Sequence, residues 1–125
     1  MNKAMLLKPV IWIGPSKKDL LDLPKEVQHE IGFALFRAQQ GLKHLSAKPL
    51  KGFKGAGVLE VVEDYSGDTF RAVYTVRFSK AVYVLHVFQK KSKHGIATPK
   101  RELDVIEQRL KIAEDHHVRW SKEGK

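Results

Sequence analysis

Cationic side chains gather on one predicted hairpin and directly after it, and they are the clearest indication of chemistry in the chain. Two strand-like runs, residues 70–78 and 81–89, are joined by a tight turn. The cations are Arg71 and Arg77 on the first run, and Lys90, Lys91 and Lys93 directly after the second. Because arginine grips a phosphate with two parallel hydrogen bonds and lysine supplies a point charge, this hairpin is suited to hold a polyanion. A rim that only keeps a small domain soluble is the alternative for each of the lysines.

The alternation of side chains along a strand sorts the first run into two faces. One face carries Phe70, Ala72, Tyr74, Val76 and Phe78, which predicts that it packs on the core. Tyr74 is therefore expected to be a core aromatic. The other face carries Arg71 and Arg77 and is predicted to be open. In an ordinary hairpin register, Glu60 of the preceding strand lies on the open face with Arg71.

Composition limits the kinds of protein that the chain can be. Its 125 residues fit one domain, with a core at about residues 10–115 and both ends flexible. The formal net charge of +9 favours an anionic partner, such as nucleic acid, a membrane surface or an acidic protein. The sequence holds no cysteine, which excludes disulfides and thiolate metal sites. No apolar run approaches the roughly twenty residues of a membrane span, and no signal peptide is recognisable, so we expect a cytoplasmic protein.

Local signals predict a small α+β domain. The predicted strands are residues 10–13, 58–64, 70–78 and 81–89, and the predicted helices begin at Ser16, Pro24 and Thr98. The short connections between the last three strands predict an antiparallel meander. Its final strand is apolar on both faces and is expected to be central. We expect the helices to lie against one face of this sheet, and residues 117–125 to form a frayed end.

Two further groups of residues could bind a ligand. The segment 43–57 is rich in lysine and glycine and has no periodicity, which predicts a loop. Its Lys51 and Lys54 are candidates for contacts along an RNA backbone, with a solvated loop as the alternative. The adjacent His116 and His117 point in different directions on a helix, so we expect no metal site there, and no motif calls for a cofactor.

The predicted strands FRAVYTVRF and VYVLHVFQKKSK are followed by the stretch TPKRELDVIEQRL. Together they resemble toxins of the RelE/ParE superfamily, and most closely the HigB-like, phage-derived branch of that superfamily. The stretches LPKEVQHEIGFALFRAQQG and KPLKGFKGAGVLEV extend it to about residues 10–115. The resemblance implies a RelE-like fold, a twisted antiparallel sheet with two N-terminal helices on one face and a C-terminal helix beside it. It also implies the toxin of a type II toxin–antitoxin pair, whose antitoxin commonly carries a helix-turn-helix domain. RelE-like members cut mRNA in the ribosomal A site, whereas ParE-like members inhibit DNA gyrase.

The resemblance implies roles for individual residues. Arg71 matches the arginine of the RelE-type YR-x2-Y strand, which contacts the scissile phosphate. Lys90 and Lys91 match the basic pair at the end of the last strand, and Glu60 matches the glutamate of a common W/L-E-L/V strand. There are departures, because RelE itself carries lysines on the strand of Glu60. The late tyrosine or histidine of several relatives has only His94 as a counterpart.

Metal-independent cleavage of RNA uses the ribose 2′-hydroxyl as the nucleophile, and it needs a base, cations for the developing charge and an acid. Our hypothesis is that Arg71 stabilises the phosphate and that Glu60 or Lys90 is the base. Neighbouring cations lower the pKa of a lysine from about 10.4, which suits a lysine cluster. The candidates for the acid are Lys91, Lys93 and His94. An ion pair that only orients Arg71 is the alternative for Glu60.

The most favoured function is a ribosome-dependent mRNA endonuclease, an mRNA interferase that inhibits translation. The residues expected to bind RNA beside the catalytic group are Arg77, Lys93, His94, Lys51 and Lys54. A gyrase inhibitor on the same fold is one alternative, and it predicts toxicity that survives the loss of Arg71. A non-toxic basic nucleic-acid-binding domain is the other, and it predicts salt-dependent binding to any polyanion.

Overall fold

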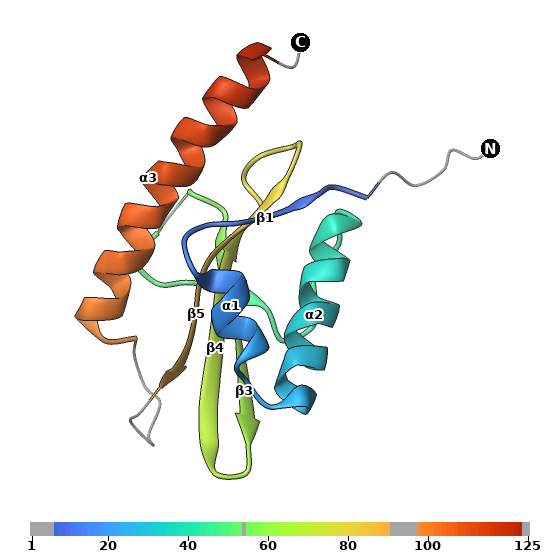
Figure 1. The fold of residues 1–125 in the computed structure, drawn as a ribbon, viewed down its shortest axis with the longest axis vertical. Coiled ribbons are helices and arrows are strands. Elements are labelled where there is room, and N and C mark those ends of the chain that lie inside the picture. The colour runs from blue at the N-terminus through green and yellow to red at the C-terminus, as the bar shows by residue number, and fades with distance from the viewer. Residues whose placement is uncertain (1–6, 54, 91–97, 124–125) are drawn as a thin grey trace, which may run out of the picture.

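A five-stranded sheet with helices on both faces forms the centre of the protein (Figure 1). The computed structural model describes residues 7–53, 55–90 and 98–123. The strands are β1 (Val10–Trp12), β2 (Lys48–Pro49), β3 (Val58–Tyr65), β4 (Asp68–Thr75) and β5 (Val82–Lys90), and the helices are α1 (Ser16–Leu21), α2 (Lys25–Gln39) and α3 (Lys100–Glu123). This order of elements confirms the predicted α+β class. None of the described helices is both long and apolar enough to cross a lipid bilayer.

The sheet has the strand order β1-β5-β4-β3-β2, and β3, β4 and β5 form the predicted antiparallel meander. β1 pairs with β5 in parallel, with Val10 aligned to Val82. The prediction of an antiparallel sheet does not include this pair. The N–H of Ile13 and the hydroxyl of Ser16 both donate to the carbonyl oxygen of Val84, at 3.0 and 3.3 Å. These contacts join the start of α1 to β5. β5 lies between β1 and β4 and is therefore interior, as its apolar faces predict, although the middle strand of the sheet is β4.

α1 and α2 cover one face of the sheet, and α3 covers the other (Figure 1). On the first face, Val27 and Ile31 of α2 pack with Phe70, Ala72 and Tyr74 of β4. The second core contains Ile106, Leu110 and Ala113 of α3 together with Val73, Tyr83 and Leu85. The prediction that the helices share one face is therefore wrong. Because α3 has an apolar stripe and the second face of β5 is apolar too, each buries the other.

Tyr74 is a core residue, as strand alternation predicts. It is 1% exposed and packs in the core beneath α2. Burial raises the pKa of its phenol to about 12, since the charged form would be desolvated. A phenol in this environment is unsuited to proton transfer.

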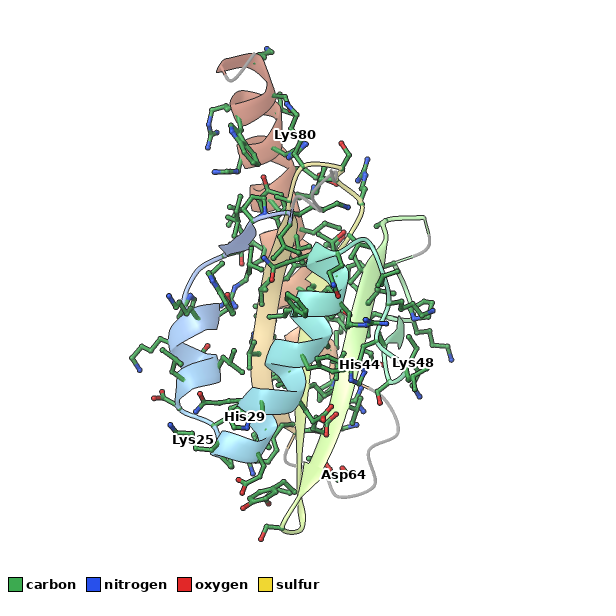
Figure 2. All side chains as sticks on the ribbon, turned by 90° about the vertical axis from the view of Figure 1, so that its right-hand side faces the viewer. Lys25, His29, His44, Lys48, Asp64 and Lys80 are labelled. Carbon is green, nitrogen blue, oxygen red and sulfur yellow. The ribbon has the colours of Figure 1, made fainter. Side chains whose placement is uncertain are left out.

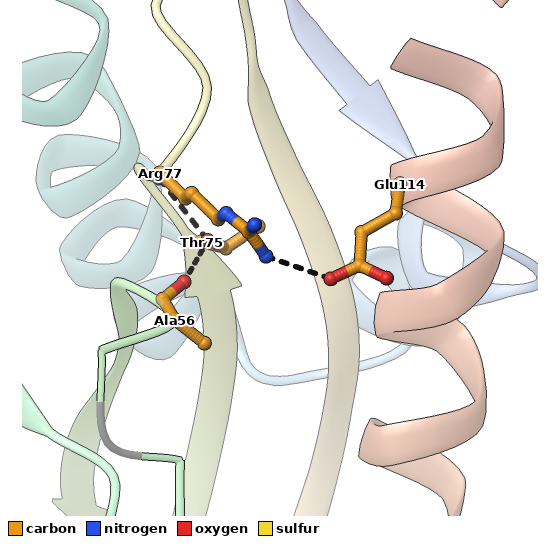
Figure 3. A network of polar contacts seen from close by, with 4 residues as sticks. All are labelled: Ala56, Thr75, Arg77 and Glu114. Atoms are coloured by element: carbon orange, nitrogen blue, oxygen red, sulfur yellow. Dashed lines mark hydrogen bonds and ion pairs between the residues drawn. The ribbon is translucent and has the colours of Figure 1, made fainter. Parts of the chain in front are cut away.

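β4 ends at Thr75 rather than at residue 78. The Thr75 hydroxyl donates to the carbonyl oxygen of Ala56 at 3.0 Å and accepts from the N–H of Arg77 at 3.1 Å (Figure 3). The N–H of Val76 donates to the carbonyl oxygen of Gly57 at 3.0 Å. These bonds hold the end of the 50–57 loop against the end of β4.

α3 continues to Glu123 instead of fraying from residue 117. The Tyr83 hydroxyl lies 2.8 Å from Nδ1 of His116 and 3.3 Å from Nδ1 of His117. Trp120 is half-buried against the core beneath α3. These aromatic contacts hold the last turns of the helix on β5. Across the described residues, no group of three or more His, Cys, Asp and Glu side chains could hold a metal ion.

Candidate functional site

An extra residue in β5 decides which of its side chains face α3. Val73 pairs with His86, whereas the next residue of β4, Tyr74, pairs with Val84, so Leu85 is the additional residue of a bulge. Leu85 and His86 therefore both lie on the α3 side of the sheet. Without the bulge, strict alternation would place His86 in the core beneath α2.

Arg71 lies on the face of the sheet that α3 covers, instead of on an open face. It is 4% exposed, and it pairs in register with Phe88 of β5. Its Nη1 donates to Oε1 of Glu60 at 2.5 Å and to Oγ1 of Thr98 at 3.3 Å. The predicted juxtaposition of Glu60 and Arg71 is confirmed. The prediction that their face is open is wrong, because α3 and the residues just before it cover that face.

Lys90, the last residue of β5, brings an ammonium group to the same face. It pairs in register with Thr69, two residues before Arg71, and it is buried. Burial is the largest cause that lowers the pKa of Lys90, and the charge of Arg71 lowers it further, while the Glu60 carboxylate raises it. A lysine with a lowered pKa releases its proton more readily than a free lysine, which is the property that a proton donor needs.

The pair of Glu60 and Arg71 lines a hollow of about 370 Å³, which we call the Arg71 hollow. Its lining residues are Leu50, Lys51, Gly52, Glu60, Arg71, Thr98 and Leu103. Lys51 brings an exposed cation to the wall. Lys48, which pairs in register with Glu60, is exposed at the sheet edge (Figure 2). A hollow of this size with a buried arginine and an exposed lysine is suited to a phosphate-bearing ligand.

Several residues of the predicted site do not join the Arg71 hollow. Lys54, Lys91, Lys93 and His94 lie outside the described residues, so their roles stay predictions. Arg77 is six residues beyond Arg71 in the chain, which is about 20 Å in a strand. Its Nη1 donates to Oε2 of Glu114 on α3 at 2.7 Å (Figure 3). The structure therefore places Arg77 apart from the hollow, and its contact with RNA stays a prediction.

A histidine network on the α3 side of the sheet was not predicted from the sequence. Nη1 of Arg109 donates to Nδ1 of His86 at 3.2 Å and to the carbonyl oxygen of Leu85 at 3.0 Å. Because arginine only donates, Nδ1 accepts, and Nε2 carries the proton that is donated to Oε1 of Glu102 at 2.6 Å. The His86 ring also stacks on Phe88 with 4.5 Å between centroids. The only signal in the sequence is a lone histidine in an apolar strand, facing an acid and a base seven residues apart on a helix.

We expect acid to weaken the fold through His86. Burial lowers its pKa first and the Arg109 charge lowers it further, while the hydrogen bond and charge of Glu102, and more weakly Asp19, raise it. Since the folded-state pKa is lowered, the stabilisation is complete above the unfolded value of about 6.5 and is lost as the pH falls through the folded value. The free energy of unfolding in urea should fall between pH 7 and pH 5 by up to about 1.4 kcal/mol per pH unit from this group.

The matched variant is His86→Gln, whose amide can donate to Glu102 and accept from Arg109 without titrating. Its stability should depend less on pH than that of the wild-type protein over the same range. His117 also has a pKa lowered by burial, but it is present in both proteins and cancels in the comparison. Parallel pH profiles for the two proteins would contradict this assignment.

Comparison with known proteins gives one family and a distant structural likeness. Residues 18–111 match the family described as "Phage derived protein Gp49-like". No curated protein matches the chain. Among solved structures, the crystal structure of the toxin–antitoxin complex RelBE2 from Mycobacterium tuberculosis contains a similar chain with 20% sequence identity and a TM-score of 0.45, which covers 73% of this chain and 100% of that one. The family match includes every residue that lines the Arg71 hollow.

Proposed function

Since the chain belongs to the phage-derived Gp49-like family, a family of RelE/HigB-like toxins, we propose that it is a type II toxin that cleaves mRNA on the ribosome and so inhibits translation. The observation that carries the proposal is the grouping of a buried arginine, a carboxylate and a lysine of lowered pKa on one face of the sheet, two of them lining a hollow. These are the three kinds of group that metal-independent cleavage of RNA requires.

Arg71 has the role of phosphate ligand in this proposal. Its guanidinium is held by Glu60 and Thr98, and it lines the hollow that the RNA backbone would enter. The negative charge on the phosphate oxygens grows as the 2′-oxygen attacks phosphorus. A preorganised cation in a largely buried site stabilises that charge more than water does.

Glu60 and Lys90 have the roles of base and acid. Glu60 takes the proton of the 2′-hydroxyl while the 2′-oxygen forms a bond to phosphorus. The bond from phosphorus to the 5′-oxygen breaks, and Lys90 donates a proton to that oxygen. The products are a 2′,3′-cyclic phosphate and a 5′-hydroxyl, and exchange with water returns both side chains to their starting states. The lowered pKa of Lys90 supports its role as the donor.

The toxin would act in the cytoplasm, where it meets ribosomes and mRNA. A cognate antitoxin, of the helix-turn-helix type, would neutralise it. The net charge of +9 supports anionic partners of both kinds, RNA and an acidic protein segment. The proposed reaction draws on the RNA, water and side chains of this chain.

Purified protein added to a translating extract with end-labelled mRNA tests the proposal. We expect new ends inside translated codons, with a cyclic phosphate on one fragment and a 5′-hydroxyl on the other. The same mRNA without ribosomes should be cut far less. Intact mRNA in the presence of folded protein would refute the nuclease function and would turn attention to inhibition of gyrase or to simple binding of nucleic acid.

A further inference from the structure

A second and larger hollow, of about 790 Å³, adjoins the Arg71 hollow along the loop that follows β2. Its lining residues are Pro49, Leu50, Lys51, Gly52, Phe53, Gly55, Gly57, Val58 and Leu59. The two hollows share Leu50, Lys51 and Gly52 as a common wall. We propose that the larger hollow binds a nucleobase of the RNA whose scissile phosphate lies at Arg71, a role that rests on the proposed function.

The lining of the larger hollow has the chemistry that a base needs. Most of its side chains are apolar, and Phe53 offers an aromatic ring that is half-buried against the core beneath α3. The exposed backbone of Gly52 and Gly55 adds N–H and carbonyl groups without side chains to obstruct them. A base presents a flat apolar face for stacking and a polar edge for hydrogen bonds. The larger hollow offers both an apolar aromatic wall for the face of a base and backbone polar groups for its edge.

The hollow is preformed, because main-chain bonds hold the loop around it. The N–H of Leu50 donates to the carbonyl oxygen of Val58 at 3.0 Å, and the N–H of Phe53 donates to the carbonyl oxygen of Leu50 at 3.3 Å. The N–H of Ala56 donates to the carbonyl oxygen of Phe53 at 3.1 Å. A binding site that is already formed spends little free energy on ordering when its ligand arrives.

Charge and continuity favour a nucleotide over an uncharged apolar ligand. Lys51 stands on the shared wall, between the apolar hollow and the buried arginine. Among the described lining residues of the larger hollow there is no carboxylate. The phosphate and base of one nucleotide are joined through its ribose, so a phosphate at Arg71 brings an adjacent base to the shared wall. A single ligand can thus occupy both hollows.

Binding of dinucleotides, followed by nuclear magnetic resonance titration without ribosomes, tests the inference. The probe is a dinucleotide whose first sugar is 2′-deoxyribose, which blocks cleavage, and two abasic versions lack either the first or the second base. For the wild-type protein, removal of one of the two bases should weaken binding roughly tenfold, the size expected for loss of one stacked base. Removal of the other base should have a smaller effect.

Two variants of Phe53 test whether the contribution of the base to binding comes from the larger hollow. Phe53→Leu keeps apolar bulk against the core but removes the aromatic face, so the affinity difference between the full and abasic probes should disappear. Phe53→Tyr keeps the ring and should keep the difference. The inference is overturned if Phe53→Leu discriminates as the wild-type protein does, if neither abasic probe differs from the full one, or if no dinucleotide binds at millimolar concentration.

Failure of the base-binding subsite and failure of the proposed nuclease function give different results. A protein that cuts mRNA but ignores the bases of the dinucleotide would retain its nuclease function and lose only this subsite, leaving the hollow to an apolar protein partner. A protein that binds bases through Phe53 but leaves mRNA intact would retain the subsite and lose the nuclease function.

Discussion

The Arg71→Lys variant should cleave mRNA at least about a hundredfold more slowly than the wild-type protein. Lysine preserves the positive charge but cannot form two parallel N–H bonds to a phosphate. Arg71 also holds Glu60 and Thr98 through one nitrogen, Nη1, and a lysine would have to serve both partners and the phosphate from its single nitrogen, Nζ. The loss should appear in the cleavage rate measured at saturating ribosomes, because the interaction between Arg71 and the phosphate strengthens as negative charge develops on the phosphate.

Alanine is a poor substitute at this position, although it is the obvious choice from the sequence. The Glu60 side chain is 13% exposed and forms its ion pair with Arg71. Removing one partner of a buried pair leaves the other charge uncompensated, and this costs about 3–5 kcal/mol of stability when burial is complete. An inactive Arg71→Ala protein would therefore be hard to distinguish from an unfolded one.

Arg77→Lys is the matched control for Arg71→Lys. It makes the same change in the same part of the chain, but Arg77 is paired with Glu114 and is about half exposed. Its cleavage rate at saturating ribosomes should stay within about threefold of the wild-type rate, because lysine keeps the charge that a contact with the RNA backbone needs, and an exposed ion pair such as that with Glu114 contributes about 0–1 kcal/mol. Mapping of new 5′ ends gives the rate for all three proteins, and circular dichroism confirms their folds. An Arg71→Lys protein that is folded and fully active would remove Arg71 from the mechanism.

The parts of the site that lie within one hairpin were predictable from the sequence. Strand alternation is enough to place Glu60 on the same face as Arg71, and the structure joins them by an ion pair. The same alternation assigns Tyr74 to the core, where it is 1% exposed. Both results depend only on the two-residue alternation of side chains along a strand and on a short turn between the strands. These are properties of residues that are close in the sequence.

The parts that depend on distant elements were not predictable. Alternation says which side chains share a face but not what covers it, so the burial of Arg71 at 4% exposure was missed. The bulge at Leu85 brings His86 to the α3 side, and no glycine or proline marks it in a strand that is apolar on both faces. The parallel pairing of β1 with β5 joins residues about seventy positions apart, which no local pattern encodes.

The 50–57 loop contributes the wall that the two hollows share, and at Gly57 it approaches the backbone just after β4 closely. Gly57→Ala should lower the free energy of unfolding by about 2–4 kcal/mol. Gly57 has φ +63°, and a Cβ there would lie 3.0 Å from the backbone N and 3.1 Å from Cα of Arg77. Neither atom can move without displacing the end of β4, where the N–H of Val76 donates to the carbonyl oxygen of Gly57.

Gly55→Ala separates the two causes of that loss. Gly55 also has a positive φ, +77°, but apart from its chain neighbours no described residue lies within 4 Å of a Cβ built there. Alanine at residue 55 should therefore cost only the strain of a left-handed backbone, about 1–2 kcal/mol. Urea unfolding of the two variants and the wild-type protein gives both values, and their difference measures the contact with the Arg77 backbone. Equal losses at both positions would mean that the loop yields to the added methyl group, so that the wall between the hollows is softer than its main-chain bonds indicate.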